Sequence, residues 1–155
     1  MTMLRNTVAE QQWGSIPATM CALDGSGNLQ PLPANQDVTL LPSATRTATT
    51  NSANQTNLTG CGVMVYLNVT AASGTGGLKV AIQVIDPSSG SVGTVFIATT
   101  AVTATGIYTY TIYPGLGVSE GALSANCLLP VGWRIQVQHS DGSNYTYSVG
   151  ASIIF

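Results

Sequence analysis

From Gly106 to Gly150 the chain reads GIYTYTIYPGLGVSEGALSANCLLPVGWRIQVQHSDGSNYTYSVG, and this stretch carries its strongest structural signal. Residues 107–112, 133–139 and 145–149 each alternate between apolar and polar side chains. Alternation with a period of two turns one side of a strand toward a core and the other toward water or a partner. A Pro-Gly pair and the turn sequence DGSN separate the three runs. We therefore expect a strand, a crossing loop and a hairpin.

Two segments upstream show the same alternation. Residues 61–70 place four apolar side chains on one face, and residues 78–100 form two runs around the turn sequence DPSSG, which predicts a hairpin. A shorter run, residues 38–41, is expected to end at Pro42, because proline cannot donate a ladder hydrogen bond. The Thr-rich residues 44–52 are typical of an edge or exposed strand.

This spacing of strands predicts an all-β fold: an antiparallel β-sandwich, jelly-roll-like, with about eight strands over residues 37–155. Residues 1–36 lack the pattern and are expected to form an N-terminal arm, extended or with a short helix near residues 5–12. The spaced apolar residues of the arm are Leu4, Val8, Trp13 and Ile16. Because the arm cannot form a core, it must pack on its own domain or on a neighbouring subunit. In the second case these four residues are the candidate partner-binding contacts.

Charge is scarce in this chain. Charged residues make up 6% of the 155 residues, against roughly 25% in ordinary soluble domains, whereas 45% are hydrophobic and can supply a core. Charge normally keeps surfaces and edge strands from associating. Its scarcity indicates a subunit of a larger assembly. The alternative is a β domain whose solubility rests on serine and threonine hydroxyls.

Charge and cysteine usage also exclude several classes of partner. The net charge is −2 and the four basic residues are scattered, so we expect no binding to nucleic acid or to anionic membranes. Cys21, Cys61 and Cys127 lack C-x-x-C spacing, which suits neither a disulfide framework nor a zinc site. We expect them to be buried free thiols. Since no signal peptide or spanning apolar run is apparent, we expect synthesis in a cytosol.

Two short sequences could suggest catalysis. Residues 117–121, GVSEG, match the nucleophile-elbow pattern around Ser119, but no helix is predicted after them. The only histidine, His139, precedes Asp141, which reverses the order of acid and histidine in hydrolases. These two residues could pair as acid and base, although an Asp that starts a turn normally bonds its own backbone. The chain also shows no cluster of carboxylates. We expect no enzymatic activity, catalytic site, metal or cofactor.

Aromatic residues are concentrated between Gly106 and Gly150. They are Tyr108, Tyr110, Tyr113, Trp133, Tyr145 and Tyr147. If they are exposed on one face of a sheet, they can stack on sugars or on a protein partner. The alternative is that several of them fill the core and keep their hydroxyls at its rim.

Four motifs occur in order along the second half of the chain: DPSSG at 86–90, IYTYTIYPG at 107–115, LPVGWRIQVQH at 129–139 and YSVGAS at 147–152. In this order the chain resembles a family of small β proteins encoded among the head genes of tailed bacteriophages. The resemblance covers roughly residues 60–155. It implies a virion structural role, as a capsid decoration or cement protein that stabilises the assembled head lattice.

The resemblance also implies partners and a location. The protein would bind the major capsid protein on the exterior of the virion, as a homo-oligomer (dimer or trimer), after synthesis in the host cytoplasm. The alternative is a carbohydrate-binding or fibre-associated sandwich module of a phage particle that uses the tyrosine-rich face.

Overall fold

The structure is a computed structural model that describes residues 21–23, 29–31, 36–117 and 124–155. It divides into two units, Met1–Ala34 and Asn35–Phe155. In the first unit, strand β1 (Cys21–Leu23) pairs antiparallel with β2 (Leu29–Pro31). The helix that we considered near residues 5–12 lies outside the described residues.

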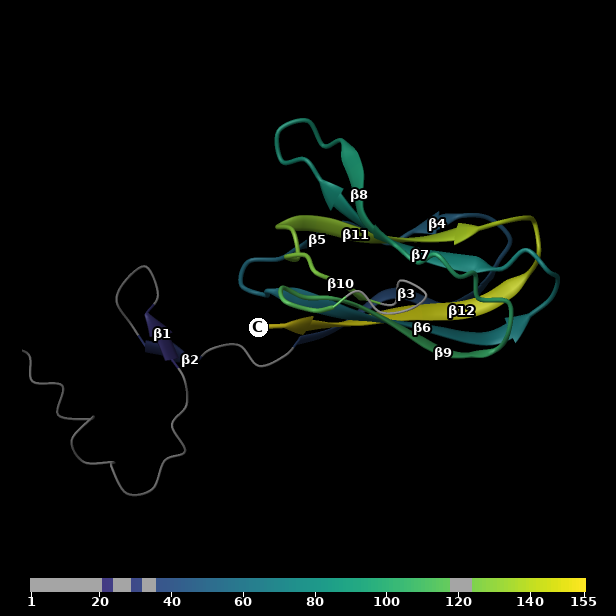
Figure 1. The fold of residues 1–155 in the computed structure, drawn as a ribbon, viewed down its shortest axis with the longest axis horizontal. Coiled ribbons are helices and arrows are strands. Elements are labelled where there is room, and N and C mark those ends of the chain that lie inside the picture. The colour runs from purple at the N-terminus through teal and green to yellow at the C-terminus, as the bar shows by residue number, and fades with distance from the viewer. Residues whose placement is uncertain (1–20, 24–28, 32–35, 118–123) are drawn as a thin grey trace, which may run out of the picture. The chain divides into compact units, whose positions relative to one another are not determined.

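The second unit is a sandwich of two five-stranded sheets (Figure 1). We name each sheet after a central strand. The β6 sheet contains, in spatial order, β10 (Ser124–Ala125), β9 (Gly106–Ile112), β6 (Gly62–Ala72), β12 (Tyr145–Ile154) and β3 (Gln36–Arg46). The β7 sheet contains β4 (Thr50–Asn51), β11 (Gly132–His139), β7 (Leu78–Ile85) and β8 (Val92–Ile97), with β5 (Gln55–Thr56) also paired to β11. All pairings are antiparallel except that of β10 with β9.

The connections between strands follow a jelly-roll order. Strands β4 and β5 pair with successive parts of β11 and act as one interrupted edge strand. The order β3-β12-β6-β9 in one sheet then faces the order β4/β5-β11-β7-β8 in the other. In this arrangement the chain passes repeatedly from one sheet to the other, as in two Greek keys. The predicted all-β, jelly-roll-like sandwich is confirmed.

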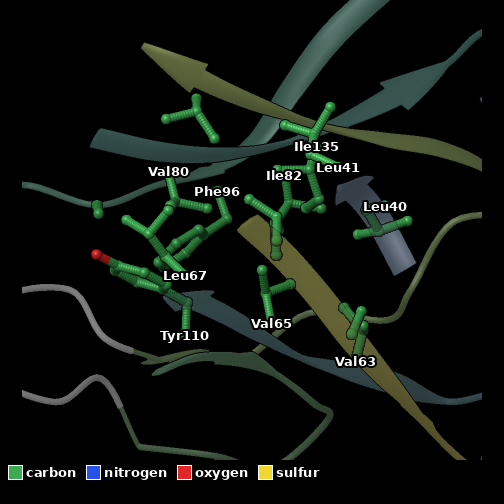
Figure 2. Packing of buried hydrophobic residues seen from close by; sticks show 14 of the residues in the cluster. Leu40, Leu41, Val63, Val65, Leu67, Val80, Ile82, Phe96, Tyr110 and Ile135 are labelled. Atoms are coloured by element: carbon green, nitrogen blue, oxygen red, sulfur yellow. The ribbon is translucent and has the colours of Figure 1, made fainter. Parts of the chain in front are cut away.

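The core lies between the two sheets and is made by the alternating strands. In β6, Val63, Val65 and Leu67 are fully buried, whereas the residues between them are half-buried on the outer face. Ile82 of β7 and Ile135 of β11 pack toward them from the opposite sheet (Figure 2). Full burial of one such side chain contributes about 1.5–3 kcal/mol to folding. Because alternation puts every second side chain of these strands between the sheets, their burial holds the two layers together.

Strand β9 confirms the predicted alternation of its residues. Tyr110 and Ile112 are buried, whereas Ile107 is 70% exposed on the outer face of the β6 sheet. Strands β7 and β8 confirm the predicted hairpin. At its turn Asp86 Oδ1 accepts hydrogen bonds from the backbone and hydroxyl of Ser88, and Gly90 takes a positive φ of 71°.

The hairpin predicted for residues 133–149 is wrong. Strand β11 pairs with β7, whereas β12 pairs with β6 and β3, so the two strands belong to opposite sheets. Residues 140–144 therefore carry the chain from one layer to the other. Both strands turn their apolar side chains inward, and each faces the other across the core. Alternation reports which face of a strand is buried, but not which strand it pairs with.

The predicted end of a strand at Pro42 is also wrong, because β3 continues to Arg46. Pro42 is exposed on an edge strand, where no outer partner needs its missing N–H group. The pairing of β3 with β12 shifts register twice between Ala44 and Thr39. These bulges explain why the consecutive residues Leu40 and Leu41 are both buried.

We predict that Gly62→Ala destabilises the sandwich by about 1–3 kcal/mol, since overpacking forces backbone shifts. A Cβ atom at Gly62 would lie 2.4 Å from the carbonyl oxygen of Ile112 on the adjacent strand β9. Urea-induced unfolding measures the change. The matched control is Gly142→Ala, because a Cβ there meets no atom within 4 Å. Equal effects of the two substitutions would contradict the close approach of β6 to β9.

Candidate functional site

One end of the sandwich is organised by the buried side chain of Asn57, which joins two loops. Its Nδ2 donates to the carbonyl oxygens of Gly60 (2.8 Å) and Leu129 (3.1 Å), and its Oδ1 accepts from the backbone N–H of Gly60 (2.8 Å). The backbone N–H of Asn57 also donates to the carbonyl of Val131, at 2.7 Å. The loops at residues 57–61 and 126–131 are therefore held together by a fully bonded amide.

These two loops expose large apolar side chains. Leu58 is 84% exposed, Leu128 is 64% exposed and Val131 is 66% exposed. We call these three residues, together with Pro130, the end surface. Single exposed apolar residues are ordinary, whereas several on loops tied together by hydrogen bonds make this end a candidate interaction site.

Two hollows flank the end surface and share Thr56. One has a volume of about 220 Å³ and is lined on one side by Leu58 and Phe155. The other, of about 340 Å³, is lined by apolar side chains that include Val84 and Val131. Among the described residues, no side chain that lines either hollow is charged. The geometry therefore favours an apolar partner.

The predicted partner-binding residues Leu4, Val8, Trp13 and Ile16 lie outside the described residues. The chain enters β3 at Gln36, which lines the smaller hollow together with the C-terminal residue Phe155. Residues 118–121 of the GVSEG motif, Ser119 included, also lie outside the described residues. The structure therefore neither supports nor opposes a role for these segments.

His139 lies at the far end of β11 from the end surface, next to tyrosines of the other sheet. Its Nε2 is 3.3 Å from the hydroxyl of Tyr147, and its ring packs edge-on against Tyr145 with centroids 5.8 Å apart. Its Nδ1 is buried and has no hydrogen-bond partner. Burial, together with the positive charge of Arg46, lowers the pKa of His139, while the Ser143 backbone and Asp141 act in the opposite direction.

Asp141 does not form a hydrogen-bonded acid–base pair with His139. Its Oδ1 accepts a hydrogen bond of 2.9 Å from the backbone N–H of Ser143, two residues later. The side chain and backbone of Ser143 lower the pKa of this exposed carboxyl. Asp141 thus bonds its own turn, as the sequence suggested for an Asp at that place.

The aromatic side chains between Gly106 and Gly150 do not form an exposed platform. Four of them are at most 1% exposed: Tyr110, Trp133, Tyr145 and Tyr147. The hydroxyl of Tyr145 accepts from the backbone N–H of Gly77 at 3.0 Å, and burial raises the pKa of Tyr110 to about 12. The interpretation that several of these aromatic residues fill the core is confirmed. A stacking surface that includes Tyr145 is excluded by its burial.

Cys61 and Cys127 are free thiols, as expected, although each is half-buried and not fully buried. Within the described ranges no three histidine, cysteine or acidic side chains lie close enough to hold a metal ion. Among the same residues no helix has the length and apolar character needed to cross a membrane.

Comparison with protein-family models finds no match to this chain, and comparison with curated proteins finds none either.

Sequence reasoning missed the end surface. Leu58 stands alone between polar residues, and Leu128 and Val131 lie on either side of Leu129-Pro130 in a loop. Position between strands does not by itself indicate exposure, because Leu129 in the same loop is buried. The alternation pattern could not show that two distant loops meet through Asn57, which lies 72 residues before Leu129 in the sequence.

We predict that Asn57→Ala destabilises the protein by about 1–3 kcal/mol, because it leaves buried backbone groups of Gly60 and Leu129 without partners. Chemical denaturation measures this loss. Asn51→Ala is the matched control, since Asn51 is exposed and its side chain bonds only Gln136. An Asn57→Ala variant as stable as this control would show that the loops are not held by the amide.

We also predict that stability falls as the pH drops from about 7 to about 5 because of His139. Its pKa in the folded protein lies below the ordinary value of 6.5, so the unfolded chain binds the proton more readily. The contribution is complete above the unfolded pKa and is lost as the pH falls toward the folded one. Urea unfolding at both pH values should show a smaller dependence in His139→Gln. An unchanged dependence would contradict the burial effect.

Proposed function

We propose that this protein is a structural subunit of a phage virion: a capsid decoration or cement protein that binds the outside of the assembled head. The observation that carries the proposal is the end surface, an uncharged cluster of exposed apolar side chains on hydrogen-bonded loops. The resemblance of residues 60–155 to phage head proteins supports the same role.

The charge distribution supports attachment to an apolar protein surface. Only 6% of the residues are charged, and no charged side chain in the part of the chain that the structure describes lines the hollows beside Leu58 and Val131. The cores of protein interfaces are depleted of charge and enriched in apolar side chains. The partner that the resemblance implies is the major capsid protein, with the homo-oligomer (dimer or trimer) as the binding unit. The function needs no catalysis, cofactor, nucleic acid or membrane.

The mechanism is stabilisation by mass action. A subunit that binds the assembled lattice but not the free capsid protein shifts the equilibrium toward the shell. Each subunit of an oligomer adds a contact whose effective concentration is high, so modest individual affinities combine. The N-terminal arm, through Leu4, Val8, Trp13 and Ile16, would supply a second contact in addition to the end surface.

We predict that Val131→Asp and Leu58→Asp each weaken binding to the capsid at least about tenfold, since each puts an unpaired charge into an apolar contact. The assay is co-sedimentation with capsids of the encoding phage that lack this protein. The matched control is Ile107→Asp, which places the same charge on an exposed apolar position of β9. Deletion of residues 1–17 should also abolish binding while the sandwich stays folded. Full binding by all three end-surface and arm variants would overturn the proposal.

A further inference from the structure

The outer face of the β6 sheet carries a hollow of about 370 Å³ where three strands lie side by side. Its floor is Gly150 of β12, whose direct neighbours across the sheet are Tyr66 on β6 and Thr39 on β3. A Cβ atom at Gly150 would have only the carbonyl oxygen of Val38 nearby, at 3.7 Å. The missing side chain therefore leaves open space between an aromatic ring and the edge strand.

A chain of hydrogen bonds closes one end of this hollow. Ser152 Oγ donates to Asp37 Oδ1 at 2.5 Å and also lies 3.4 Å from the hydroxyl oxygen of Tyr66. These polar contacts link β6, β12 and β3, and they position the hydroxyl end of the Tyr66 side chain. A carboxylate has about four acceptor positions, so Asp37 retains acceptor capacity after bonding Ser152. Asp37 is exposed and, among the described residues that line the hollow, is the only charged one.

We propose that this hollow binds a neutral pyranose unit of a glycan. A pyranose has an apolar C–H face that can pack on the ring of Tyr66, and a rim of hydroxyls that can donate to Asp37 and bond Thr39. Aromatic packing combined with a few placed polar groups is the usual composition of a small-ligand site, and its volume falls in the ordinary range of roughly 300–1,000 Å³.

The charge of the hollow selects among sugars. Asp37 has no cationic side chain beside it among the described residues of the lining, so its carboxylate repels phosphorylated sugars and uronic acids and favours neutral hydroxyl donors. The open position on a sheet face suits a unit of a longer chain. This inference goes beyond the proposed capsid role and does not depend on it, because sugar binding is measured on the free protein.

The test is titration of the full-length ¹⁵N-labelled protein with maltose, cellobiose, lactose and di-N-acetylchitobiose, followed by NMR. We expect saturable shifts of the amides of Thr39, Tyr66, Gly150 and Ser152 with at least one of the four sugars. Gly150→Val fills the floor and keeps the polar groups, and Tyr66→Ala removes the ring. Each should raise the Kd at least about tenfold. Asp37→Asn should weaken binding in the same direction.

The control variants make the same kinds of substitution, at a tyrosine and at an aspartate, outside the hollow. Tyr108→Ala removes another half-buried tyrosine of the same sheet, and Asp86→Asn removes an exposed carboxylate in the β7–β8 turn. Both should bind sugar as the parent protein does. Should Tyr66→Ala fail to fold, Gly150→Val decides. Absence of saturable shifts with all four sugars, or an unchanged Kd in Gly150→Val, would overturn the inference.

Discussion

Burial of inward-facing side chains between two sheets is the constraint on which the rest of this structure depends. Strands β6, β7, β11 and β12 each place alternate residues in the core with almost no exposed area. Each sheet buries its inner face only because the other covers it. The chain must therefore cross between layers, and its loops gather at the ends of the sandwich.

Loops that gather at the ends can carry function without disturbing the core. The buried amide of Asn57 bonds both loops at one end, so Leu58 and Val131 remain exposed on an ordered backbone. Strand β11 runs from this end to His139 at the other. There, two tyrosines of the opposite sheet pack against the imidazole, and the neighbouring carboxylate bonds its own turn. The first end carries the surface that we propose as the partner contact, and at the second end these contacts join the two sheets.

The scarcity of charge connects the two proposals. Stability here comes from apolar burial and from hydrogen bonds of neutral side chains, as at Asn57, Ser52 and Tyr145. Such a surface can meet an apolar protein partner without a large cost of removing charges from water, and at the Gly150 hollow the charge of Asp37 is met by sugar hydroxyls. Arg46 is a charged residue that does contribute contacts. Its guanidinium lies 4.6 Å from the centre of the Tyr147 ring and donates a hydrogen bond to the Tyr147 carbonyl oxygen.

The sequence alone determined the fold class, the core faces of the strands and the β7–β8 hairpin, because period-2 alternation and turn residues are local properties. It also indicated the turn role of Asp141 for the same reason. Only the tertiary structure decided that β11 and β12 lie in opposite sheets, that β3 continues through Pro42, and that Tyr145 and Tyr147 are buried. The end surface and the Gly150 hollow likewise join residues far apart in the chain. Pairing across a sandwich depends on contacts at long sequence separation, which no local pattern specifies.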